Sequence, residues 1–320
     1  MVFADFNDLQ KHLQELYQNK EFAVALSLAT RQFDRFPENR ILLYYWRITM
    51  AVRTGDIPLS LRLLREALSS GVWYGDALLR KSPSLKSLQG LPEFEKLLEL
   101  NQELAKEDHQ ESFPLFTLRP EGRCQEGSLA CPLLLALHAN ASTAQGSMSF
   151  WKPAATTGWL VAAPQSTQAI WKGAYIWDNR EVTEREIRRY YSLLQAGYSI
   201  DPQCTVLAGH SMGGETAIWL ALKGVIETIG FIAIGPSGPF IDEPITWEPL
   251  IQENLTGNLR GYIIIGKADT EISPENIQKL IKMLNQAGIS CKLENIPNAG
   301  HDYIPEYDAS FLRALDYLIA

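Results

Sequence analysis

Cysteine is scarce in this sequence, and its spacing is uninformative. Four cysteines occur in 320 residues, and none forms the C-x-x-C pair typical of zinc and redox sites. The four are Cys124, Cys131, Cys204 and Cys291. We therefore expect structural thiols and no bound metal. Cys124 and Cys131 flank a predicted turn, but this spacing is only a weak indication of a disulfide.

Long apolar runs and basic clusters are also missing. No stretch approaches the roughly 18 apolar residues of a membrane span, and residues 1–10 lack the basic and apolar regions of a signal peptide. We therefore expect a cytoplasmic protein. Acidic residues outnumber basic ones by 37 to 29, without a run of Lys or Arg, which argues against nucleic acid and membrane surfaces as partners. A small neutral or weakly charged substrate fits better.

The first hundred residues repeat apolar side chains at helical spacing. This pattern, with Pro and Gly in the breaks, predicts helices at residues 6–18, 21–35, 39–53, 57–70 and 92–106, with short helical pieces at 75–88. A charged stretch without periodicity follows at 106–112 and resembles a linker. We predict a helical domain over residues 1–108 and a second domain over 109–320.

Two parts of the helical domain resemble each other. Residues 20–26 (KEFAVAL) align with residues 55–61 (GDIPLSL), about one tetratricopeptide period of roughly 34 residues further on. Pro37 follows the second predicted helix, as in tetratricopeptide hairpins. The resemblance implies an all-α tetratricopeptide-like domain, which either binds a protein partner or packs on the second domain. A plain helical bundle remains an alternative.

The pattern changes from residue 113 onward. Short apolar, β-branched runs alternate with helical stretches, and this is typical of a mostly parallel sheet covered by helices on both faces. The runs lie at residues 115–118, 133–138, 158–163, 204–208, 229–234, 262–265 and 291–296. The second domain is therefore predicted to belong to the α/β class.

The strongest local signal is a G-x-S-x-G motif between a predicted strand and a predicted helix. It lies in residues 206–220 (VLAGHSMGGETAIWL), with Ser211 at its centre. A turn this sharp needs small residues at Gly209 and Gly213, because a Cβ atom there would collide with the neighbouring elements. It exposes the hydroxyl of Ser211 beside the positive end of a helix, as a nucleophile requires.

Residues 209–214 (GHSMGG) resemble the nucleophile elbow of esterase and peptidase-like members of the α/β-hydrolase superfamily, and the resemblance covers about residues 113–320. It implies the α/β-hydrolase fold and a catalytic triad in the chain order Ser, acid, His. Asp269 then matches the family's acid turn (GKAD), and His301 matches its glycine-histidine loop (NAGHD). A turn aspartate without catalytic function remains an alternative for Asp269, and Asp302 is its nearest rival as the acid.

The resemblance also implies an oxyanion hole. Its donors would be the N–H groups of Met212, directly after the nucleophile, and of Asn140, in the loop after the strand at 133–138. Ala139 replaces the glycine usual in this loop, so the path of the backbone there is open. An ordinary loop at the end of a strand is the alternative.

These residues together predict a serine hydrolase that cleaves carboxylic esters through an acyl-enzyme, with Ser211 as nucleophile, His301 as base and Asp269 orienting His301. No metal or organic cofactor is implied. A peptidase or amidase with the same triad is the first alternative. A non-catalytic scaffold with a helical interaction module is the second, although such a protein would have little reason to keep all three residue types in order.

Overall fold

The structure is a computed structural model that describes residues 3–108, 114–124, 129–253 and 259–320. The chain divides into two compact units. One comprises Met1–Glu111 with Ala169–Lys172, and the other comprises Ser112–Gln168 with Gly173–Ala320. Residues 169–172 thus belong with the helices, although the pattern of the sequence predicts them to lie in the second domain.

The first unit is helical, as predicted. Its helices are α1 (Phe6–Gln18), α2 (Phe22–Gln32), α3 (Arg40–Arg53), α4 (Ile57–Ser69), α5 (Asp76–Leu79) and α6 (Pro92–Glu107). Asp5 and Asp56 cap α1 and α4 by accepting hydrogen bonds from N–H groups of their first turns. Gly55, between α3 and α4, has a φ of 83°, a conformation that glycine adopts without strain.

Residues 169–172 join this unit through backbone and side-chain contacts. The N–H of Gly75 donates to the carbonyl oxygen of Ile170 at 2.7 Å, and Trp171 packs against the apolar cluster of α3, α4 and α6. A Cβ atom on Gly75 would lie 2.2 Å from the carbonyl oxygen of Ala169, so only glycine permits this approach. The sequence does not predict this short strand, because its three residues leave no periodic pattern.

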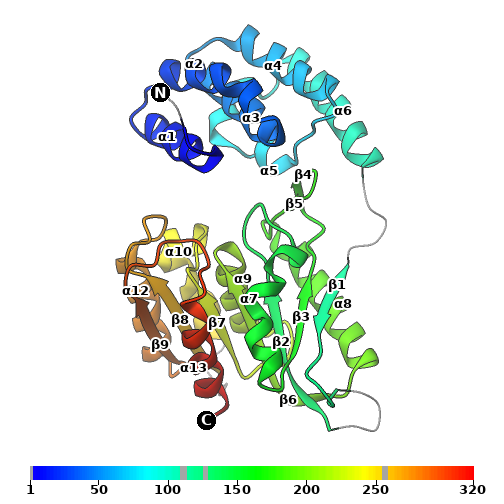
Figure 1. Cartoon of the computed structure of the whole chain (residues 1–320), viewed down its shortest axis with the longest axis vertical. Helices are drawn as coiled ribbons and strands as arrows, with labels where there is room; N and C mark the ends of the chain where they lie inside the picture. Colours follow the sequence, from blue (N-terminus) through cyan, green and yellow to red (C-terminus); the bar gives the residue numbers. More distant parts are fainter. Residues whose placement is uncertain (1–2, 109–113, 125–128, 254–258) are drawn as a thin grey trace. The chain divides into compact units, whose positions relative to one another are not determined.

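The second unit contains a seven-stranded sheet in the order β1-β3-β2-β6-β7-β8-β9 (Figure 1). Its strands are β1 (Leu115–Leu118), β2 (Cys131–Leu137), β3 (Leu160–Pro164), β6 (Ile200–His210), β7 (Gly230–Ile234), β8 (Arg260–Gly266) and β9 (Ser290–Ile296). All seven predicted strands are present. Only β1 is antiparallel to its neighbour, β3. The remaining short strands are β4 (Ala169–Trp171) and β5 (Ala174–Tyr175).

Helices cover both faces of this sheet, as predicted (Figure 1). They are α7 (Ala144–Thr156), α8 (Arg180–Gly197), α9 (Met212–Lys223), α10 (Pro239–Asp242), α11 (Glu248–Glu253), α12 (Pro274–Gln286) and α13 (Tyr307–Ile319). One apolar core joins α8, α9, α11 and α12 to the sheet, and the other joins α7 and α13 to its opposite face. Because both faces of the sheet are covered, side chains on both sides of each strand are buried, and this explains the continuous apolar runs.

The chain changes its direction across the sheet around β2. From β2 the chain adds β3 on one side, and it then crosses over to place β6 on the other side of β2. The helices that follow these two strands cover opposite faces of the sheet, so the loops after β2 and β6 diverge, as expected at a switch point. Gly209 of β6 lies in register with Leu137 of β2, so the loops that follow these strands start at the same level.

The cysteines require a correction. Cys124 and Cys131 form a disulfide, with their Cα atoms 5.4 Å apart, so the prediction of four structural thiols is wrong for this pair. Spacing alone could not show that the chain turns back so closely between them, and residues 125–128 of that turn lie outside the described residues. Cys204 and Cys291 are free thiols. Among the described residues, no helix is long and apolar enough to cross a membrane.

Candidate active site

Ser211 lies on a sharp turn between β6 and α9. Its φ of 55° and ψ of −126° fall in a region that residues with side chains rarely adopt, and such strain is typical of functional turns. A Cβ atom on Gly209 would lie 2.1 Å from the carbonyl oxygen of Gly213, and one on Gly213 would lie 2.4 Å from that of Leu137. The turn therefore needs both glycines, because a Cβ atom at either position would collide with neighbouring backbone, as predicted.

The side chains of Ser211, His301 and Asp269 meet at the carboxyl ends of the strands. The Oγ atom of Ser211 lies 2.9 Å from Nε2 of His301, and Nδ1 of His301 lies 2.8 Å from Oδ2 of Asp269. Asp269 follows β8 and His301 follows β9, so each side chain comes from the end of a separate strand. Asp302, the rival acid, is exposed.

This arrangement sets the charges of the pair. Burial by itself opposes ionisation of Asp269, but hydrogen bonds from His301 and from the N–H groups of Glu271 and Ile272 bring its pKa below the usual value. Burial likewise disfavours the charged form of His301, yet Asp269, Glu271 and Asp302 raise its pKa above the usual value. An ionised Asp269 therefore faces the Nδ1–H of His301, and Nε2 is left to accept the hydroxyl proton of Ser211.

Two other histidines lie near this site, and burial keeps both neutral. It lowers the pKa of His138 and that of His210 to about 4. The Nδ1–H of His138 donates to the carbonyl oxygen of Ala139 at 2.9 Å, while its Nε2 accepts from the N–H of Ser166. The Nε2–H of His210 donates to the carbonyl oxygen of His301 at 2.7 Å. Both histidines therefore hold loops of the site in place.

Met212 and Asn140, the predicted oxyanion donors, come from different elements. Met212 is the first residue of α9, and the first-turn N–H groups of a helix have no acceptor within it. Asn140 follows β2 in an exposed turn and makes no hydrogen bond with the three meeting side chains in the described part of the chain. The elbow nevertheless touches this loop, because a Cβ atom on Gly213 would lie 2.6 Å from the carbonyl oxygen of His138.

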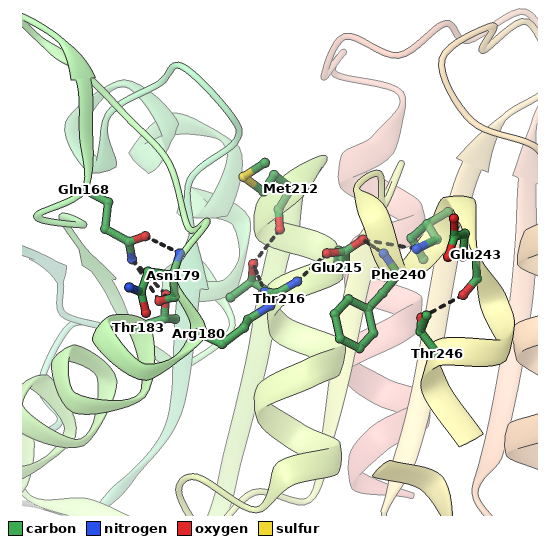
Figure 2. A network of polar contacts seen from close by, with 11 residues as sticks. Gln168, Asn179, Arg180, Thr183, Met212, Glu215, Thr216, Phe240, Glu243 and Thr246 are labelled. Carbon is green, nitrogen blue, oxygen red and sulfur yellow. Dashed lines mark hydrogen bonds and ion pairs between the residues drawn. The ribbon is translucent and has the colours of Figure 1, made fainter. Parts of the chain in front are cut away.

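Three further polar residues lie around the site, and no sequence motif predicts any of them. Ser237 places its Oγ 3.0 Å from Oγ of Ser211, and Glu271 places Oε2 3.5 Å from Nε2 of His301. Glu215, one turn into α9, is fully buried and pairs with Arg180 (Figure 2). In the sequence, Glu215 directly follows the elbow, and Ser237 stands beside a glycine just after a buried strand. Neither pattern by itself predicts a functional residue.

The site can activate a serine hydroxyl, and nothing in the described ranges points to metal chemistry. No group of three or more His, Cys, Asp or Glu side chains there is placed to hold a metal ion.

The aromatic side chains near the elbow mainly pack together. Phe150 stacks on Tyr303 with ring centroids 4.2 Å apart, and Trp177 donates from Nε1 to the carbonyl oxygen of His138.

Comparisons with known proteins agree with this architecture. Residues 5–109 match a family model described as "A/B hydrolase-like, N-terminal domain". No curated protein matches the chain.

Among solved structures, an uncharacterized protein from Bacillus cereus ATCC 10987 is similar over 98% of this chain and 99% of its own, with 22% identity and a TM-score of 0.53. Esterase PE8 is similar over 64% of this chain and 99% of its own, with 18% identity and a TM-score of 0.51.

FphF, a fluorophosphonate-binding serine hydrolase of Staphylococcus aureus, is similar over 66% of this chain and 96% of its own, with 16% identity and a TM-score of 0.51. At these identities the likeness concerns the fold. The chain has the α/β-hydrolase fold with an N-terminal helical region, as the sequence predicts.

Proposed function

We propose that this protein is a serine hydrolase that cleaves carboxylic ester bonds through an acyl-enzyme. The observation that carries the proposal is the chain of two hydrogen bonds from Ser211 Oγ to His301 Nε2 at 2.9 Å and from His301 Nδ1 to Asp269 Oδ2 at 2.8 Å. The strained backbone of Ser211 supports it, because a fold has little reason to keep such a turn for packing alone.

In the first half of the reaction, Ser211 Oγ attacks the carbonyl carbon of the ester while its proton passes to Nε2 of His301. Asp269 accepts the Nδ1–H and stabilises the imidazolium that forms. The N–H groups of Met212 and Asn140 are proposed to hold the oxyanion of the tetrahedral intermediate. Collapse of this intermediate breaks the bond to the leaving alcohol, which takes the proton from Nε2.

In the second half, water replaces the alcohol. His301 removes a proton from the water as it attacks the acyl carbon, and the same oxyanion donors hold the second intermediate. Its collapse releases the carboxylic acid and returns the proton from Nε2 to Ser211 Oγ. The resting state therefore has neutral His301 and ionised Asp269, the direction in which the pKa of Asp269 is shifted.

Fluorophosphonate labelling is the first test of this proposal. A reactive serine in the intact protein should be labelled, and labelling should disappear in Ser211→Ala and persist in the control Ser192→Ala, whose hydroxyl is bonded to the backbone of α8. A panel of p-nitrophenyl esters of rising chain length, run against the matching anilides, then compares ester with amide bonds. Faster anilide turnover would favour the peptidase or amidase alternative, and a folded protein that is neither labelled nor active would favour the scaffold alternative.

The helical unit and the location of the protein are also matters of proposal. We propose that the helices form a tetratricopeptide-like module able to bind a protein partner, supported by the packing of each helix from α1 to α4 against the next one in the chain. The cytoplasmic location stays a prediction. The disulfide between Cys124 and Cys131 argues against this location, because disulfides persist mainly in oxidising compartments. Quantifying free thiols in the protein purified from its native compartment tests that location.

A further inference from the structure

We propose that Ser237 is a further catalytic residue, whose hydroxyl donates a hydrogen bond to Oγ of Ser211, and that the buried carboxylate of Glu215 positions it. The inference rests on the proposed function, since it concerns the same nucleophile. Its starting observation is the 3.0 Å separation between the two hydroxyl oxygens.

The donor in this contact follows from counting protons. Ser211 has a single O–H, and Nε2 of His301 is an acceptor when Nδ1–H donates to Asp269. The proton of Ser211 therefore points to His301 in the arrangement that can react. The 3.0 Å contact is then a hydrogen bond only if Ser237 donates and Ser211 Oγ accepts.

A donor at this oxygen affects the reaction in both directions. Negative charge gathers on Oγ as its proton leaves for His301, and it gathers there again when the acyl-enzyme breaks down and Oγ departs. A hydrogen bond to a charged oxygen is stronger than one to a neutral hydroxyl, so Ser237 stabilises these transition states more than the resting enzyme. Formation and breakdown of the acyl-enzyme should both depend on it.

The backbone holds Ser237 against the nucleophile. The N–H of Ser237 donates to the carbonyl oxygen of Ser211 at 3.2 Å, and the N–H of Ser211 donates to that of Ile234 at 3.0 Å. Ile234 is in register with His210, so the loop after β7 starts at the level of the elbow. Ser237 therefore contacts Ser211 through one side-chain and one backbone hydrogen bond, which together join the two loops.

Glu215 fixes the residues directly after Ser237 (Figure 2). Its Oε2 atom accepts from the N–H of Phe240 at 2.9 Å and from the N–H of Ile241 at 3.1 Å. Gly238 packs against the same carboxylate, because a Cβ atom there would lie 2.4 Å from Oε2. The loop therefore cannot shift away from the elbow without uncovering a buried carboxylate, which costs free energy.

Arg180 completes the network from a third element (Figure 2). Its guanidinium pairs with Glu215 and donates from Nη1 to Oγ1 of Thr216 at 3.0 Å. The guanidinium carbon also lies 5.4 Å from the ring centre of Trp219 and 5.2 Å from that of Phe240, at cation–π distance. The charge of Glu215 is thus balanced, so the carboxylate can remain buried as an acceptor for the loop.

The test compares Ser237→Ala, Ser237→Thr and the control Ser192→Ala in the full-length protein, with circular dichroism and thermal melting to check folding. We expect Ser237→Ala to lower both the fluorophosphonate labelling rate and kcat/KM on p-nitrophenyl acetate by about tenfold to a hundredfold, with KM little changed. Ser237→Thr keeps a hydroxyl and should recover most of the activity, and Ser192→Ala should match the wild type. Wild-type rates in a folded Ser237→Ala would overturn the inference while the proposed function stands, whereas an inert wild type would overturn both.

A double-mutant cycle tests the part assigned to Glu215. If this residue acts through Ser237, Glu215→Gln should lower kcat, and the variant that combines Glu215→Gln with Ser237→Ala should be no slower than Ser237→Ala alone. Losses that multiply would overturn the positioning step. If Glu215→Gln fails to fold, Arg180→Lys in the same cycle supplies the measurement, because it loosens the same carboxylate.

Discussion

The side chain of His210 forms a hydrogen bond with the backbone of His301, since Nε2 of His210 lies 2.7 Å from the carbonyl oxygen of His301. The residue before the nucleophile is therefore bonded to the residue proposed as the general base. We predict that His210→Phe, which keeps a ring and loses the donor, lowers kcat by about tenfold, because His301 gains freedom to leave Ser211.

Steady-state ester hydrolysis measures this effect. The control is His12→Phe, a histidine of α1 in the helical unit, which should leave kcat unchanged. Equal rates for His210→Phe and the wild type would show that the bond does not matter for turnover.

The carboxylate of Glu271, with Oε2 3.5 Å from Nε2 of His301, should affect the pH dependence of the activity. His301 must be neutral to accept a proton, so activity falls as the pH drops through its pKa. Asp269, Glu271 and Asp302 raise that pKa despite the opposing effect of burial. Glu271→Gln should therefore lower the pKa of His301 and move the acidic limb of kcat/KM to lower pH.

The pH profile of kcat/KM at low ionic strength is the appropriate measurement, because the side chain of Glu271 is 59% exposed and salt screens its charge. Glu275→Gln, on the first turn of α12, is the control and should leave the limb in place. A limb that moves to higher pH in Glu271→Gln would contradict the electrostatic account.

Two aspartates near His301 allow a paired substitution. Asp269 contacts Nδ1 of His301 from a buried position, whereas Asp302 is exposed. Asp269→Asn should hold His301 in the wrong tautomer and lower kcat by roughly four orders of magnitude, while Asp302→Asn should cost little. Kinetics of both variants, with folding checked by thermal melting, decide the matter. If Asp302→Asn were the more damaging change, Asp269 would not be the acid.

The glycine after Met212 offers a steric prediction. Gly213→Ala would place a Cβ atom 2.4 Å from the carbonyl oxygen of Leu137 and 2.6 Å from that of His138, so the elbow or β2 must move. We expect loss of activity and a lowered melting temperature. Gly197→Ala, at the end of α8 with no atom within 4 Å of the added Cβ, is the control and should melt like the wild type. A stable, active Gly213→Ala would contradict the packing described for the elbow.

Most of the fold could be predicted, because the spacing of apolar residues along the chain specifies most of its helices and strands. Helical spacing gave α1 as residues 6–18 and α3 within one residue at its start, and continuous apolar runs gave all seven strands of the sheet. Residues 169–172 and the disulfide could not be predicted. Residues 169–172 depend on contacts with helices far away in the chain, and a three-residue strand does not specify such contacts. The disulfide depends on how closely the chain brings Cys124 and Cys131 together, and their spacing does not specify that.

The residues of the candidate site also fall into two groups, those that the sequence predicts and those that it does not. Ser211, Asp269 and His301 occur in motifs with fixed order, and the structure brings the three side chains together. Ser237 and Glu215 carry no motif, because their importance arises from contacts across the ends of separate strands and helices. Asn140 and Met212 stay predictions as oxyanion donors.

Hydrolysis of a p-nitrophenyl ester by Ser211→Ala and His301→Ala, compared with the wild type, tests the central claim most directly. We predict that both variants fold, melt near the wild-type temperature and lose roughly a thousandfold or more in kcat. Turnover by folded Ser211→Ala at a rate near that of the wild type would contradict the claim that this serine is the nucleophile.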